Sequence, residues 1–141
     1  SAQTNRAVAY IAIVTDLENI GDFIDKTLGD HVRRMAERKR RFSEEGAIEL
    51  ESFLKAVEEM YREAVSAFVT RDGKAAEIVI ARKESIGQIE KELRHAHIRR
   101  LQKGTPESLE SSAAHLDILS AGKGIASHCA AVAYSVLQME E

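Results

Sequence analysis

The sequence predicts an all-α fold, an elongated antiparallel bundle of four helices that run up, down, up and down. Its composition suits long helices, because Ala, Leu, Ile, Glu, Lys and Arg dominate and there is a single Pro. Apolar residues recur every three or four positions along four long segments. Only a few residues separate these segments, so consecutive helices should be antiparallel neighbours. We expect residues 1–141 to form a single domain.

The first two helices are predicted over residues 5–40 and 44–70. The apolar stripe of the first extends from Tyr10 to Met35 at a spacing of three and four. Ser43 is placed to begin the second helix, since a serine hydroxyl accepts a hydrogen bond from an N–H group of the first turn. The stripe of the second helix consists of Leu50, Leu54, Val57, Tyr61, Ala64 and Phe68.

The third and fourth helices are predicted over residues 73–103 and 106–139. Asp72 precedes Gly73 in a turn signal and can cap the third helix. Gly104 suits the position just after a helix, where a left-handed backbone is common. Thr105-Pro106-Glu107 then supplies a capping residue, a proline at the first helical position and an acid behind it.

Two of the apolar stripes are interrupted. In the third helix the step from Val79 to Ile86 is a full heptad, filled by Arg82-Lys83-Glu84, so at least one of these residues should approach the interior. In the fourth helix the stripe fails around Gly122 and Gly124. A glycine inside a helix costs about 1 kcal/mol relative to alanine. These two glycines therefore indicate either a close approach of another element or a kink.

An acidic pair lies in the first helix. Glu18 and Asp22 are one turn apart, and residues four apart on a helix lie side by side. Like charges held that close repel unless a cation or a basic side chain compensates them. We hypothesise that Lys83 or Lys123 neutralises the pair across the core. The alternative is that all of these charges point outward into solvent.

A strongly basic run, Arg33–Arg41, ends the first helix. It could contact anionic lipid head groups or the acidic surface of a partner. Alternatively it is a solvated helix end whose cations complement the helix dipole. Nucleic acid is not the expected partner, because the net charge is −3 and no aromatic platform accompanies the run.

Several classes of protein are excluded or disfavoured by what the sequence lacks. No apolar run reaches the roughly 18–20 residues that span a bilayer. There is no nucleophile elbow, glycine-rich phosphate loop or cysteine-pair metal spacing, so we predict no enzymatic activity. The single cysteine, Cys129, cannot form an internal disulfide and is expected to be a buried, inert thiol. The histidines form no ligand set, since His95 and His97 point in different directions, and His115 and His128 are expected to be ordinary core or surface residues.

Two parts of the sequence resemble a known protein family. The segment Asp16-Leu17-Glu18-Asn19-Ile20-Gly21-Asp22 resembles the signature of PhoU domains, with Asn19 where Arg is usual. The run Arg94-x-x-His97-x-x-Arg100-Leu101-x-x-Gly104-x-Pro106-Glu107-Ser108, followed by His115-Leu116-Asp117-Ile118-Leu119, resembles the cytosolic PhoU-like tail of bacterial Na/Pi cotransporter family proteins. The resemblance covers nearly the whole chain.

This resemblance implies a regulatory or interaction domain of a sodium-dependent inorganic phosphate cotransporter. The chain would be a fragment of a larger membrane transporter, beginning at the third helix of a first repeat and including the whole second repeat. Its partner would be the transmembrane transport domain of the same polypeptide. Its location would be the cytoplasmic face of the bacterial inner membrane, as part of an integral membrane protein.

The resemblance also implies a metal site, because PhoU motifs of the form Glu/Asp-x-x-x-Asp can hold iron or zinc. Only Glu18 and Asp22 match that motif, and the corresponding stretch of the fourth helix has lost its acids. An alternative function is therefore an iron- or zinc-binding helical bundle, in which Glu84, Glu90 or Asp117 completes the ligand set. A free-standing PhoU-like regulator is a further alternative. We also expect self-association as a dimer, because a partial bundle exposes apolar surface.

Overall fold

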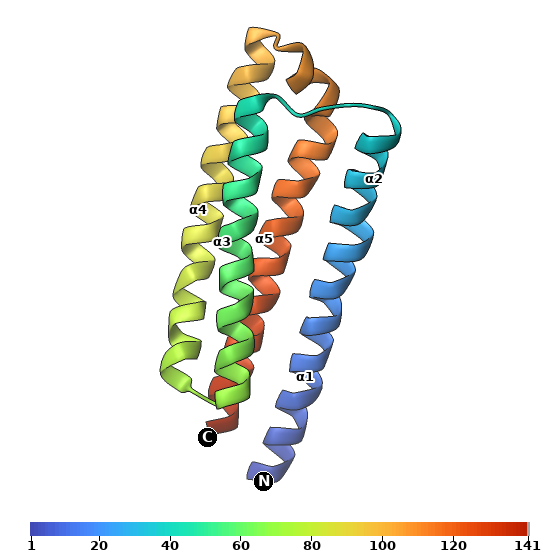
Figure 1. The fold of residues 1–141 in the computed structure, drawn as a ribbon. Helices are drawn as coiled ribbons and strands as arrows, with labels where there is room; N and C mark the ends of the chain where they lie inside the picture. The colour runs from blue at the N-terminus through green and yellow to red at the C-terminus, as the bar shows by residue number, and fades with distance from the viewer. Residues whose placement is uncertain (141) are drawn as a thin grey trace.

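Helices account for all the regular structure of residues 1–140, the part of the chain that the computed structural model describes. The elements are, in chain order, α1 (Ala2–Asp22), the π-helix η1 (Phe23–Leu28), α2 (Gly29–Glu37), α3 (Glu44–Thr70), α4 (Gly73–Lys103) and α5 (Pro106–Glu140). Figure 1 shows α1, η1 and α2 as one long arm, followed by three antiparallel helices. The predicted elongated four-helix bundle is confirmed.

The first helical arm differs from the predicted 5–40 segment in its ends and in its middle. It begins at Ala2, where the Ser1 hydroxyl accepts a hydrogen bond from the N–H of Thr4, and ends at Glu37. At its centre the N–H of Gly29 donates to the carbonyl of Ile24, five residues back, in the wide π-helical pattern. An apolar spacing of three and four cannot distinguish this wide turn from ordinary α-helix.

Three of the predicted helix ends carry the expected caps. Ser43 Oγ accepts a hydrogen bond from the N–H of Gly46 at 3.1 Å. Asp72 accepts hydrogen bonds from the N–H groups of Lys74 and Ala75. Gly104 adopts a left-handed backbone with φ of 76°. These local interactions fix the starts of α3 and α4 and the end of α4.

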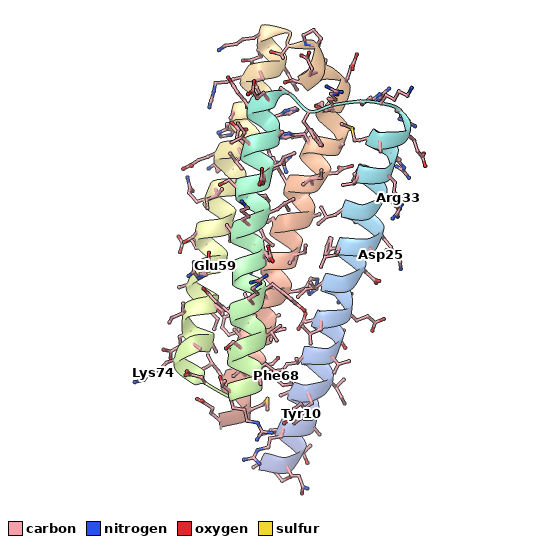
Figure 2. All side chains as sticks on the ribbon, viewed as in Figure 1. Tyr10, Asp25, Arg33, Glu59, Phe68 and Lys74 are labelled. Carbon is pink, nitrogen blue, oxygen red and sulfur yellow. The ribbon has the colours of Figure 1, made fainter. Side chains whose placement is uncertain are left out.

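Helix α5 is the central element of the molecule. The backbones of α3, α4 and α5 pack against one another as a three-helix core, whereas the backbone of the arm packs closely against α5 only. Side chains bridge the arm and α3 near the chain termini, where the Tyr10 and Phe68 rings meet edge to face at 6.0 Å. Figure 2 shows these two residues at the end of the bundle that holds the chain termini. Because α5 contacts both the core and the arm, apolar or small residues are needed around most of its circumference.

The two glycines of α5 mark close approaches to two different elements. A Cβ atom at Gly122 would lie 2.4 Å from Cε1 of Phe53 on α3, and one at Gly124 would lie 2.6 Å from Cζ of Phe23 in η1. Phe53 is 1% exposed, so its ring has no room to withdraw. Of the two alternatives, close approach therefore explains both glycines.

Arg82 accounts for the polar interruption in the apolar stripe of α4. Its guanidinium forms an ion pair with Glu63 of α3, and both side chains are partly buried. Lys83 and Glu84 are exposed. One of the three residues thus approaches the interior, as the heptad gap predicts.

The predicted cellular location is wrong. No helix within residues 1–140 is both long enough and apolar enough to pass through a membrane. This finding contradicts the assignment of the chain to the cytoplasmic face of the bacterial inner membrane as part of an integral membrane protein.

Substituting Gly122→Ala should destabilise the bundle by roughly 1–3 kcal/mol, because the added methyl group overlaps the immobile Phe53 ring. The matched control is Gly87→Ala on α4, where an added Cβ meets nothing within 4 Å. There the gain in helix propensity should stabilise the protein by up to about 1 kcal/mol. Urea unfolding of both variants checks this, and an equal or greater stability of the Gly122 variant would contradict the packing argument.

Candidate functional site: a buried polar cluster in the helical core

The predicted acidic pair is exposed to solvent. Glu18 and Asp22 are both exposed, and Asp22 forms an ion pair of 3.6 Å with Lys26 of its own arm. Lys83 and Lys123 are also exposed, and neither forms an ion pair within residues 1–140. The hypothesis that one of these two lysines neutralises the pair is wrong, and the outward-pointing alternative holds.

The residues considered as further metal ligands are dispersed. Glu84 is exposed, Glu90 is bound by Arg94, and Asp117 is bound by His31. Among residues 1–140, no three His, Cys, Asp or Glu side chains form a group that could hold a metal ion. A cation held by Glu18 and Asp22 alone stays a prediction.

Asp16 is the acidic residue of the segment Asp16–Asp22 that points inward. Its Oδ1 lies 2.7 Å from Nδ1 of His128, which joins α1 to α5. His128 also packs against the Phe23 ring of η1, with ring centroids 5.9 Å apart. The neighbouring Cys129 is fully buried, and burial, with a smaller contribution from Asp16, raises the pKa of its thiol to about 12. The thiol is thus protonated and inert at neutral pH, as predicted.

A second histidine–aspartate pair joins the arm to α5. His31 Nε2 of α2 lies 3.1 Å from Asp117 Oδ2 of α5. The two pairs are reciprocal, since the arm contributes the acid in one and the histidine in the other. Together they link both halves of the arm to α5 by polar contacts, of which Asp16–His128 is a hydrogen bond.

The core of α3, α4 and α5 becomes polar toward the C-terminal end of α4. The buried face of α4 begins with Ala76, Val79 and Ile86 and continues with Glu90, His97 and Arg100. We call the side chains gathered there the polar cluster. Its members are Glu49 of α3, Glu90, Arg94, His97 and Arg100 of α4, and Ser112, His115 and Ser120 of α5.

Two arginines of α4 hold the carboxylates of the polar cluster. Arg94 donates from Nε to Glu90 Oε1 at 2.8 Å and from Nη2 to Ser120 Oγ at 3.0 Å. Arg100 faces Glu49 as a fork, with Nη1 to Oε1 and Nη2 to Oε2 both at 3.0 Å. Glu90 and Arg100 are only 5% and 8% exposed, and a buried charge without a partner would be strongly destabilising. Within each pair, the opposite charge of one side chain therefore offsets the cost of burying the other.

Two stacked histidines lie between these ion pairs. The rings of His97 and His115 are 4.2 Å apart and nearly parallel, and His97 Nε2 lies 2.9 Å from Ser112 Oγ. Burial, the neighbouring His97 and the two arginines lower the pKa of His115 to about 3. Burial and Arg100 also lower the pKa of His97. The stack is consistent with neutral imidazoles, which avoid a buried charge repulsion.

Several buried atoms of this region have hydrogen-bonding capacity left over. His97 Nδ1, His115 Nε2, Arg100 Nε and Ser108 Oγ make no hydrogen bond to other residues. The Ser112–His97 contact lacks the carboxylate on Nδ1 that would orient a catalytic histidine. The arrangement therefore suits a structural polar network, which specifies one register of the three helices.

The polar cluster was missed by reasoning from the sequence, although a signal exists. Glu90, Arg94, His97 and Arg100 follow one another at intervals of three and four, which places them on one face of α4. Long polar side chains with that spacing ordinarily indicate a solvated face. Only the matching acid on α3 and the histidine on α5 show that this face is buried.

Replacing Asp16→Asn should lower the free energy of unfolding by roughly 1–2 kcal/mol, because it removes the charged partner of the half-buried His128. The matched control, Glu18→Gln, changes the same charge two residues away on the exposed side and should have almost no effect. Urea unfolding at pH 7 compares the two. Equal losses would show that the Asp16–His128 contact does not hold the arm.

The neutral histidine stack makes stability depend on acidity. The folded-state pKa of His115, about 3, lies below its ordinary value of 6.5, so the unfolded chain binds an extra proton between these limits. The free energy of unfolding should therefore fall as the pH drops below about 6.5, by up to about 1.4 kcal/mol per unit for this one residue. His115→Gln should reduce that slope in urea unfolding between pH 7 and pH 4.

His95→Gln is the control for this measurement, because His95 is exposed on the same helix. It should keep the wild-type slope. Indistinguishable slopes in all three proteins would contradict the burial of a neutral imidazole at residue 115.

Known proteins provide an independent comparison. The protein of Salmonella typhimurium strain LT2 named "Putative inorganic phosphate export protein YjbB" is 28% identical to this chain over 139 residues. Proteins of the same name from Escherichia coli K12 and Shigella flexneri are 25% identical over 139 residues. In each case the match covers 99% of this chain but only 26% of the relative. No solved structure matches the chain.

A family model agrees with these relatives and with the helical architecture. The model of the PhoU domain matches residues 50–136, which is more than half of the chain. The matched range includes most of α3, all of α4 and most of α5, the three helices that form the core and its polar cluster. The chain belongs to the PhoU domain family.

Proposed function

We propose that this chain is a non-catalytic regulatory and interaction module of a phosphate-transport protein. The observation that carries the proposal is the PhoU family match together with relatives whose printed name refers to inorganic phosphate export. Those relatives are much longer than this chain, so the module would act on a transport unit outside the residues described here. Sodium coupling, which the resemblance implies, is a finer part of the same proposal.

The open side of the arm offers a place for such a partner. A hollow of about 170 Å³ lies between the arm and α3, lined by Ile20, Ile24 and Leu28 on one side and Leu54, Val57 and Tyr61 on the other. Its lining is almost wholly apolar, and we call it the apolar groove. Further along α1, Val8, Ile11 and Val14 are each about 60–70% exposed. Exposed apolar surface of this kind favours association with another helix.

Phosphate flux in cells tests the proposal. The full-length protein that carries this chain is expressed with Ile24→Asp in the apolar groove, and uptake and efflux of radiolabelled phosphate are measured with and without a sodium gradient. Blocking the groove should change the flux by roughly fivefold or more, as expected for loss of a regulatory coupling. The control Ile78→Asp replaces an equally exposed isoleucine on α4 and should leave the flux unchanged.

Wild-type flux in the Ile24→Asp protein would overturn the assignment of the groove, and a flux that is also unchanged after deletion of the whole module would overturn the regulatory function. Sodium independence of all variants would remove the finer proposal alone. Self-association is the other occupant we propose for the groove. Light scattering of the isolated chain would then show a dimer that Ile24→Asp dissociates.

A further inference from the structure

Three arginines at the end of the arm line one small hollow. It lies between α2 and the beginning of α5, has a volume of about 110 Å³, and is lined by Arg34, Arg38 and Arg40 together with His31, Glu110 and three apolar residues. The α2 end of the arm and its connection to α3 can be followed in Figure 1. The volume limits any occupant to a small group.

Local backbone structure brings the three arginines together. Arg34 of α2 and Arg38, the residue just after α2, are one helical turn apart and share a face of the arm. Lys39 then adopts a left-handed backbone with φ of 51°, and the N–H of Arg40 donates to the carbonyl of Met35 at 3.0 Å. This helix-ending motif turns the chain back, so that Arg40 reaches α5 and donates from Nη1 to the carbonyl of Glu110 at 3.4 Å.

In the part of the chain that the structure describes, these three arginines have no acidic partner, and neither do Lys39 and Arg41 of the same basic run. Within residues 1–140, Arg34, Arg38 and Arg40 form no ion pair, whereas the adjacent Arg33 is bound by Asp30. Figure 2 shows Arg33 on the side of the arm that faces away from the other helices. Of the other titratable groups at the hollow, His31 is held by Asp117, and Glu110 is the lining carboxylate. Three guanidinium groups against one carboxylate leave an excess of positive charge.

We propose that this hollow, which we call the arginine hollow, binds a phosphate-class oxyanion. The guanidinium group presents its N–H donors as a planar fork that matches two oxygens of a phosphate, and charge-assisted hydrogen bonds of this type are strong. An oxyanion there also relieves the repulsion among three cations. The phosphate group comes either from inorganic phosphate or from an anionic lipid head group. The inference goes beyond the proposed function and does not depend on it.

Binding to the 141-residue chain tests the site with two probes. Inorganic phosphate is titrated into the labelled protein while the arginine side-chain NMR signals are followed. Vesicles of phosphatidylcholine, with and without phosphatidylglycerol, are tested for co-sedimentation. The variant Arg34→Gln, Arg38→Gln, Arg40→Gln should weaken binding of the recognised probe by roughly tenfold or more, and added salt should weaken wild-type binding.

The matched control removes the same net charge elsewhere. The control variant combines Arg6→Gln, Arg33→Gln and Arg99→Gln, which replace three exposed arginines that do not line the hollow. It should bind the probe within about twofold of the wild type. All six side chains are exposed, and circular dichroism checks that both variants keep their helices.

Each outcome decides the proposal. Selective loss of phosphate binding supports the site and identifies the free ion as its ligand. Selective loss of binding to the phosphatidylglycerol vesicles supports the site and identifies a lipid head group. Equal losses in the two variants, wild-type signals that shift elsewhere on the protein, or no binding of either probe would overturn it.

Discussion

The structure depends on the packing of α5 against the core and the arm at once. This helix contacts α3 and α4 in the core and also carries the arm, so most of its circumference is buried. Packing helices closely on several sides requires small side chains at the closest points. Gly122 admits the Phe53 ring of α3, and Gly124 admits the Phe23 ring of η1. The helix propensity lost at these two glycines is offset by the aromatic rings that they allow into contact.

The arm and the core are held to α5 by different kinds of interaction. In the core, the polar cluster replaces apolar packing with two arginine–carboxylate pairs and a neutral histidine stack. Such a network fixes the register of three helices, because a shifted helix would leave buried charges without partners. The arm has no comparable network. It is held by apolar contacts and by the pairs Asp16–His128 and His31–Asp117.

This difference is consistent with an interaction module. The buried charges of the three-helix core are paired, whereas the arm packs on one helix and leaves the apolar groove open on its other side. The structure also shows how the basic run at the end of the arm is arranged. The backbone reversal at Lys39 sets three of its arginines around one hollow instead of spreading them over a solvated surface.

Much of the fold could be predicted from the sequence, because its signals are local. Apolar spacing placed the helices, and the caps at Ser43, Asp72 and Gly104 act within one turn of their own residues. The candidate site could not be found in this way. Asp16 and Glu18 are acids two residues apart in the sequence, yet only Asp16 meets a histidine. That histidine, His128, lies 112 residues away on α5, so local sequence cannot show which acid it meets.

The sequence by itself determined the helical class, the ends of α3 and α4, the small-residue positions of α5 and the segments that resemble PhoU domains. Tertiary structure alone decided which polar residues are buried. The face of α4 that carries Glu90, His97 and Arg100 is polar in every local respect, and it becomes interior only because Glu49 and His115 approach it from other helices. The physical reason is that a charge is tolerated in a core only with a partner, and Arg100 finds its partner Glu49 on another helix, 51 residues away.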